Sequence, residues 1–256
     1  MSNILTLAHK EIRSYFASPI AYIVIGFFAL VYGYFYVVML QYFVRASMQG
    51  GRMGMGASSM NINQDMLRPV VQNLTVVMLF LLPMITMRTY SEEKRSGTIE
   101  LLLTSPLTDM QIIVGKFLGA MTLYGAMLAI TIPHMALLFV YGRPEWKPIA
   151  SSYLGLLLMG GCFISLGLFI SSLTKNQIVA AAITFATFLM LWVISWIGSF
   201  SGGTMNDVLS YLSIIEHLED FTKGVIDTSH LIYYLSFITL GLFLTAKSVD
   251  SERWRG

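Results

Sequence analysis

The sequence predicts an all-α, polytopic membrane protein with six transmembrane helices, forming a single domain over residues 1–256. Two features of composition support this prediction: 55% of the residues are hydrophobic and only 12% are charged, with a mean hydropathy of +0.68. A soluble domain usually has about 25% charged residues, because it must cover its surface with polar groups. The third observation is that apolar residues gather in runs long enough to cross a bilayer, which takes about 20 residues.

Six such runs follow one another along the chain. The second is the shortest and the third is the longest. Pro83 lies near the middle of the second run and is expected to kink that helix, since proline removes a backbone donor. The predicted spans are residues 20–43, 73–87, 112–141, 153–173, 178–200 and 231–246.

Residues 1–18 precede the first span and are too polar to cross a membrane. Polar residues lie on one helical face, so we expect an amphipathic helix in the membrane interface. Ser18 and Pro19 then end this helix and begin the first span, as N-cap and first helical residue. No cleavable signal peptide is expected, because the first apolar run is too long. The expected apolar face consists of Ile4, Leu5, Ala8, Ile12, Tyr15 and Phe16.

The distribution of Lys and Arg among the loops predicts the orientation. Ten of these residues fall on the side that carries both termini and six on the other, so both termini are expected to be cytoplasmic, in the cell inner membrane. The ten are Lys10, Arg13, Arg88, Lys94, Arg95, Lys116, Lys175, Lys247, Arg253 and Arg255.

Residues 88–111, between the second and third spans, form the most charged insert. Its first half is polar, Gly97 interrupts it, and an amphipathic piece follows over residues 98–103 until Pro106. This pattern predicts two short helices that join at the glycine and lie parallel to the membrane. A solvated loop is the alternative. It does not explain why apolar side chains would face water, whereas a docking surface for a partner does.

The run from Glu92 to Pro106 resembles the signature of type-2 ABC exporter permeases. That signature is a charged stretch, Gly-Thr, an apolar residue, Glu, two or more Leu and a Pro, after the second span. The resemblance covers the whole chain and is strongest to the branch with gliding-motility and copper-enzyme-maturation permeases. It implies a coupling region that grips a cytoplasmic ABC ATPase. The residues it assigns to that interface are Glu92, Glu93, Arg95, Gly97, Thr98, Glu100, Leu101 and Leu102.

The resemblance also implies that ATP hydrolysis belongs to a separate chain. No phosphate loop of the G-x-x-x-x-G-K-[ST] kind occurs here, so ATP and Mg²⁺ are expected in the partner, with no catalytic residue, cofactor or metal site in this chain. A second copy or a homologous permease would complete the transporter, within the lipid bilayer. The net charge of +2 gives no reason to expect nucleic acid.

Ionisable residues are nearly absent from the predicted spans. Lys116 lies near the cytoplasmic end of the third span and is expected to snorkel to the interface. The small residues Gly115 and Gly119 flank it and allow close helix packing, within the chain rather than between two copies. No carboxylate lies at mid-membrane, which disfavours a proton- or sodium-coupled carrier. An apolar pathway suits a lipid-like or amphipathic substrate.

Two external segments remain. Residues 44–69 are rich in methionine, whose thioether binds Cu(I), but their irregular spacing favours a flexible apolar loop. Residues 205–225 form an amphipathic segment too polar to span. There, Glu216, His217 and Glu219 could ligate a metal, although a solvated helix face is the better interpretation. In the resembled family, helices at this place act as an external gate.

Two other functions stay open at this point. The chain could be a non-transporting membrane anchor of an ATPase-driven envelope machine, of the gliding or secretion type. It could instead be an ion channel or secondary carrier, which the missing mid-membrane carboxylate disfavours. The sequence does not identify a substrate, or tell a homodimer of permeases from a heterodimer.

Overall fold

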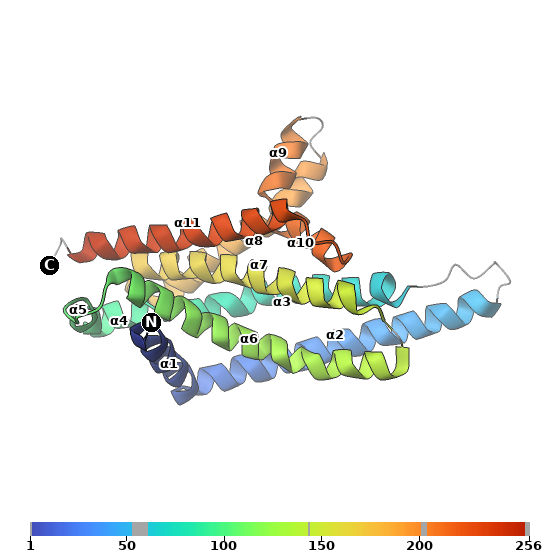
Figure 1. The fold of residues 1–256 in the computed structure, drawn as a ribbon, viewed down its shortest axis with the longest axis horizontal. Coiled ribbons are helices and arrows are strands. Elements are labelled where there is room, and N and C mark those ends of the chain that lie inside the picture. The colour runs from blue at the N-terminus through green and yellow to red at the C-terminus, as the bar shows by residue number, and fades with distance from the viewer. Residues whose placement is uncertain (1, 53–60, 143, 201–203, 254–256) are drawn as a thin grey trace.

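The computed structural model describes residues 2–52, 61–142, 144–200 and 204–253, and this part of the chain consists of helices joined by short turns and loops, with no strand. Six helices are long and apolar enough to cross a membrane, which confirms the predicted all-α, six-span architecture. The long helices run beside one another along the long axis of the molecule (Figure 1). The N-terminal helix α1 (Ser2–Ala17) and the C-terminal end of the chain lie at the same end of this bundle.

The long helices extend past the predicted spans, because hydropathy marks only their apolar portion while backbone hydrogen bonding continues into polar sequence. The difference is largest where a loop was expected over residues 44–69. There the first long helix continues to Arg52, and a π-helical turn, η1 (Asn63–Leu67), leads directly into the next. The long helices are α2 (Pro19–Arg52), α3 (Arg68–Thr86), α6 (Asp109–Gly142), α7 (Trp146–Leu173), α8 (Gln177–Phe200) and α11 (Thr228–Arg253).

Helix α7 forms the centre of the bundle. In its most apolar stretch 72% of the residues are buried, against 22% for α2 and 17% for α8 and α11. Glycines allow this close packing: a Cβ at Gly160 would collide with the Tyr124 ring, and one at Gly167 would collide with Thr86. The Tyr124 hydroxyl donates to the carbonyl of Leu156 at 2.7 Å, so the buried ring keeps its polar group satisfied.

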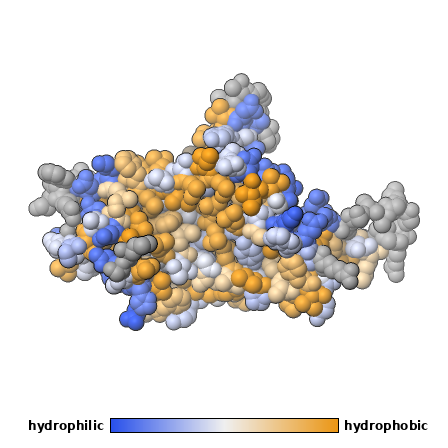
Figure 2. Space-filling model, viewed as in Figure 1, coloured by the Kyte–Doolittle hydropathy of each residue, from blue (hydrophilic) through white to orange (hydrophobic). Residues whose placement is uncertain are grey.

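The outer surface of the bundle is apolar where a bilayer would cover it. Figure 2 shows a broad hydrophobic band over the middle of the helices and polar patches toward both ends. Exposed apolar side chains of the long helices include Phe27 and Leu30 on α2, Ile183 on α8, and Leu235 and Phe243 on α11. A patch of this size on a soluble protein would cause aggregation, whereas in a membrane it is the surface that meets lipid.

The segment before α11 contains two short helices, α9 (Thr204–Leu212) and α10 (Ile214–Thr222). The end of α8 together with α9 projects from the side of the bundle (Figure 1). His217 on α10 is buried, so the solvated face expected there does not include it. Among the methionines of residues 44–69, Met66 is fully buried in the core, while Met53, Met55 and Met60 lie outside the described residues.

Candidate functional site

The candidate site is the end of the bundle where two short helices meet. Helices α4 (Ser91–Ser96) and α5 (Thr98–Leu103) stand on either side of Gly97, as the sequence predicted. Gly97 has a φ of +73°, the left-handed conformation that glycine adopts without a Cβ penalty. The chain therefore turns sharply here, and the two helices form a corner at the end of the bundle where α1 lies (Figure 1).

A buried lysine joins three parts of this corner. The side chain of Lys116 on α6 is only 1% exposed, and its Nζ donates to Glu11 Oε1 of α1 at 2.9 Å. It also donates to Glu93 Oε1 of α4 at 2.8 Å and to the carbonyl of Thr89 at 3.0 Å. The ring of Tyr90 lies 5.1 Å from the same Nζ. A buried charge is tolerated only when it is paired and hydrogen-bonded, and Lys116 meets both conditions.

The seat for α1 on α6 is made by the two glycines beside this lysine. A Cβ at Gly115 would lie 2.7 Å from Leu7, and a Cβ at Gly119 would lie 2.7 Å from the Cβ of Glu11. The missing side chains let the helices approach closely enough for Glu11 to reach the lysine. The expectation that Lys116 snorkels to the interface is therefore wrong, because α1 covers it and supplies a counter-charge.

The bundle covers one side of α1, and the expected apolar face lies only partly on that side. Leu7, Ala8 and Glu11 are buried against the bundle, whereas Leu5 is 65% exposed and Phe16 is partly exposed. The face with Asn3, Thr6, Lys10 and Arg13 is exposed, as its polarity suggests. Sequence periodicity placed Leu5 and Phe16 with Ala8 on one face, and could not show that a carboxylate is buried beside Leu7.

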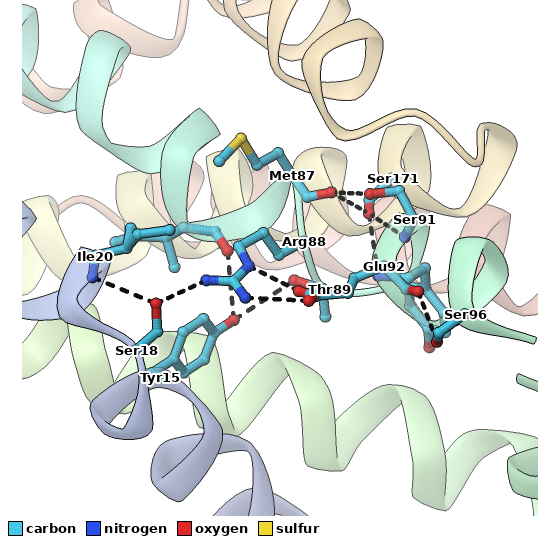
Figure 3. A network of polar contacts seen from close by, with 12 residues as sticks. Tyr15, Ser18, Ile20, Met87, Arg88, Thr89, Ser91, Glu92, Ser96 and Ser171 are labelled. Carbon is cyan, nitrogen blue, oxygen red and sulfur yellow. Dashed lines mark hydrogen bonds and ion pairs between the residues drawn. The ribbon is translucent and has the colours of Figure 1, made fainter. Parts of the chain in front are cut away.

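A second network, drawn in Figure 3, fastens α1 and α2 to the segment after α3. Arg88 donates to both carboxylate oxygens of Glu92, at 2.7 and 3.2 Å, and to the hydroxyl of Ser18 at 3.1 Å. Ser18 in turn accepts from the backbone N–H of Ile20 at 3.4 Å, which is the capping role expected at the start of α2. Burial raises the pKa of the Tyr15 hydroxyl beside this network, so it stays a neutral donor.

Ser171 of α7 anchors the start of α4 (Figure 3). Its Oγ accepts from the backbone N–H groups of Tyr90 and Ser91, both at 3.1 Å, and donates to the carbonyl of Met87 at 3.1 Å. These N–H groups precede or begin a helix and have no intrahelical acceptor. Ser171 is fully buried. Its side chain, which comes from another helix, therefore replaces an N-cap residue as the acceptor for these N–H groups.

Replacing Ser171 with alanine is expected to destabilise the chain by about 1–3 kcal/mol, because two buried N–H groups lose their acceptor. For a chain of this size that is a fall of about 2–12 °C in the unfolding temperature, measured by differential scanning fluorimetry of the purified protein. The matched control is Ser172→Ala. Ser172 is also fully buried, but its hydroxyl donates to the carbonyl of Phe169 in its own helix, and its loss should cost less than about 1 kcal/mol. Equal shifts for both variants would contradict the anchoring role.

Lys94 connects the corner to the last helix. Its side chain is 3% exposed, and its Nζ donates to Glu252 Oε1 of α11 at 2.6 Å. The corner is thus tied to α1 and α6 through Lys116, to α2 through Arg88, to α7 through Ser171 and to α11 through Lys94. A displacement of α4 and α5 would consequently also displace the helices to which they are connected, which are most of the bundle.

The eight residues assigned to a partner interface divide into two groups. Arg95, Thr98, Glu100 and Leu101 are exposed, and Leu101 is 73% exposed although apolar. Leu102 is half-buried, and Gly97 forms the turn. Glu92 and Glu93 point toward the protein instead, at Arg88 and Lys116. The interface itself stays a prediction.

Sequence reasoning missed the buried half of this site. Glu11, Ser171 and Glu252 were not singled out, since their partners lie in distant parts of the chain. One signal was present: a lysine between two glycines at helical spacing marks a place where a helix can cover a charge. In the part of the chain that is described, no group of three or more His, Cys, Asp and Glu could hold a metal ion.

Comparisons with known proteins agree with this architecture. A family model described as "ABC-2 family transporter protein" matches residues 5–247. The chain is also 29% identical over 145 residues to a protein of Escherichia coli strain K12 titled "Probable multidrug ABC transporter permease YbhR", and equally to its counterpart in Escherichia coli O157:H7. The matched region is 55% of this chain and 38% of those relatives, so the chain covers less than half of their length.

Proposed function

Because the chain belongs to the ABC-2 transporter family, as a type-2 permease that crosses the membrane several times, we propose that a separate cytoplasmic ATPase drives it. The observation that carries this proposal is the corner of α4 and α5, where exposed interface residues sit directly on a buried ionic junction. The chain has no phosphate loop of its own to bind ATP. Energy would therefore enter as movement of this corner.

The ATPase would dock on α5 and the adjoining end of α4. Leu101 offers an exposed apolar anchor, while Arg95 and Glu100 supply charges that fix orientation. Ile99, on the opposite side of α5, is buried and holds the helix against the bundle. Such an arrangement of a central apolar contact with a charged rim is typical of protein interfaces.

Movement would pass from this surface into the spans by the four connections of the corner. Closure of two ATPases on ATP would pull α5, and α4 would follow because Gly97 joins them in one turn. The Glu93–Lys116–Glu11 cluster would then carry α6 and α1, and the Lys94–Glu252 pair would carry α11. The tilt of these helices would open an exit at the other end of the bundle.

This mechanism requires the corner to face the cytoplasm, which agrees with the excess of Lys and Arg on that side. Both termini lie at the corner end of the bundle and would be cytoplasmic as well (Figure 1). The membrane would be the cell inner membrane, and a second permease, identical or homologous, would complete the transporter. We propose export of an amphipathic substrate, in keeping with the apolar spans and with the multidrug title of the relative.

Glu100→Arg tests the docking surface. Reversing one exposed charge at the centre of α5 is expected to reduce co-purification of the cytoplasmic ATPase at least about tenfold, by placing like charges together. The measurement is affinity purification from membranes with quantification of the bound ATPase. The control is Glu145→Arg, an equally exposed reversal at the start of α7, which lies at the other end of the bundle and should leave association unchanged.

Two outcomes would contradict this scheme. If the wild-type chain retains no ATPase, the transporter proposal fails. If Glu100→Arg binds as well as Glu145→Arg does, the interface lies elsewhere. An ATPase that binds, but whose turnover responds to no lipid, peptide or polysaccharide, would favour the membrane anchor instead.

A further inference from the structure

Two histidines meet at the end of the bundle away from α4 and α5. The Nδ1 atoms of His217 on α10 and His230 on α11 are 2.6 Å apart. The other ring nitrogen of His217 lies 2.8 Å from the carbonyl oxygen of Tyr211 on α9. The other ring nitrogen of His230 lies 3.0 Å from Asp220 Oδ2. Three helices therefore meet through one chain of polar contacts, in which His217 is buried, His230 is half-buried and Asp220 reaches the surface.

The partners of this chain fix how many protons it holds. A carbonyl oxygen can only accept, so Nε2 of His217 carries a proton. Hydrogen bonds from Lys223 and His230 keep the pKa of Asp220 below its usual range, so this carboxylate also accepts and Nε2 of His230 carries a proton. Between the two Nδ1 atoms there is then room for one proton. Two lone pairs would repel, and two N–H groups would clash.

We propose that His217 and His230 form a proton-binding site whose single shared proton pins α10 to α11. With it the pair carries three ring protons in all and one positive charge, opposite the Asp220 carboxylate. Nothing in this proton count depends on the ATPase or on the transported substrate. The site would respond to the pH of the compartment at this end of the protein.

The pair should lose its hold on α10 as the pH falls. Burial lowers the pKa of His217, and the charge of His230 acts in the same direction. A histidine with a lowered folded pKa stabilises the folded contact above its ordinary pKa, about 6.5, and loses that contribution as pH falls through the folded value. A further proton at low pH would set two N–H groups against each other, and the contact would weaken.

The groups around the pair belong to three helices and the turn before α11. Tyr233 stacks on His217 with ring centroids 3.8 Å apart, and Tyr234 meets it edge-on. These tyrosines are neutral donors in the relevant range, since their hydroxyls bond to the carbonyls of Leu212 and Ile214. The titratable or charged groups facing the pair are Tyr211 on α9, Glu216, Asp220 and Lys223 on or beside α10, Asp227 before α11, and Tyr233 and Tyr234 on α11.

Release of the pair would change a cavity on the other face of α10. This cavity has a volume of about 400 Å³ and is lined by α3, α8, α9 and α10. Part of its wall is formed by Glu216, Glu219 and Thr222 of α10. Each of these residues is next in sequence to a residue of α10 that faces the histidine pair or α7. A helix that is pinned at neutral pH and loosened at low pH would therefore gate this cavity.

Hydrogen exchange of the full-length chain in lipid nanodiscs tests the site directly. Amides of residues 207–222, corrected for intrinsic exchange, should be about tenfold better protected at about pH 7 than at about pH 5, because a further proton at low pH sets two N–H groups against each other. His9→Gln should keep this profile, since His9 is exposed on α1 at the far end. A flat wild-type profile would overturn the proposal.

The variants His217→Gln and His230→Gln supply the second measurement. Glutamine still donates and accepts but does not titrate in this range, so protection of residues 207–222 should become independent of pH in both. Retention of the wild-type pH profile in either variant would overturn the proposal. If a variant does not fold, the comparison of the wild type with His9→Gln still decides, because it needs neither substitution in the pair.

Discussion

Replacing Lys116 with methionine is expected to lower the unfolding temperature of the chain by roughly 6–20 °C. Methionine has a similar length and no branch, so it leaves little cavity, but Glu11 and Glu93 lose their shared cation. Removing one partner of a buried ion pair costs about 3–5 kcal/mol, because the remaining charge is buried without compensation. At about 2–4 °C for each kcal/mol in a chain of this size, the shift is readily measured by scanning fluorimetry.

Lys10→Met is the matched control for this prediction. Lys10 approaches the same carboxylate, Glu93, at 3.6 Å, but its side chain is 58% exposed. Exposed ion pairs contribute about 0–1 kcal/mol, so this variant should unfold within a few degrees of the wild type. Adding Glu11→Met to Lys116→Met should recover part of the loss by removing one stranded charge. Equal effects of the two lysine variants would show that the buried cluster does not hold α1 and α4 to α6.

Coupling should suffer along with stability in Lys116→Met. The lysine is the one group that contacts both Glu11 of α1 and Glu93 of α4 in the described ion pairs. Without it, the ATPase should still bind to the exposed face of α5, since that face is unchanged. Substrate-stimulated ATP hydrolysis should fall, because movement of α4 no longer reaches α6. An ATPase that binds but is not stimulated by substrate would show that the Lys116 cluster transmits movement, whereas the exposed face of α5 binds the ATPase.

The sequence allowed the membrane architecture to be predicted because hydropathy is a local property. A run of apolar residues predicted each of the six spans. The interruption of a helical pattern predicted the turn at Gly97. Helix ends were predicted less well. The extension of α2 to Arg52 depends on backbone hydrogen bonding through a stretch rich in glycine and methionine, and composition does not report it.

The site was predictable only in its exposed half. Apolar residues such as Leu101 facing water are visible in a pattern, since they contradict the expected polarity of a loop. The pairing of Lys116 with Glu11 joins residues 105 positions apart and depends on how α1 lies against α6. The same holds for His217, whose neighbours in sequence are acidic and suggested a solvated face, while its contacts come from α9 and α11.

The second large effect is expected at Gly119, one of the two glycines at which α1 packs closely against α6. A leucine there would place its Cβ 2.7 Å from the Cβ of Glu11, and the rest of the side chain would fill the space that α1 now occupies. Neither Cβ can rotate away, so α1 must move as a whole. Overpacking of this kind costs about 1–3 kcal/mol, and separation of Glu11 from Lys116 adds to it. We expect a fall of at least about 5 °C in the unfolding temperature.

Gly125→Leu distinguishes this steric effect from a general intolerance of the helix to larger residues. Gly125 lies on the same helix, and a Cβ there meets nothing within 4 Å. That variant should keep the wild-type unfolding temperature and ATPase stimulation, because leucine is also a good helix former. If both glycine variants behave alike, α1 is not seated on α6 in the working transporter. It would then act as an interfacial anchor, and the ATPase would have to move the spans through α4 and α11 alone.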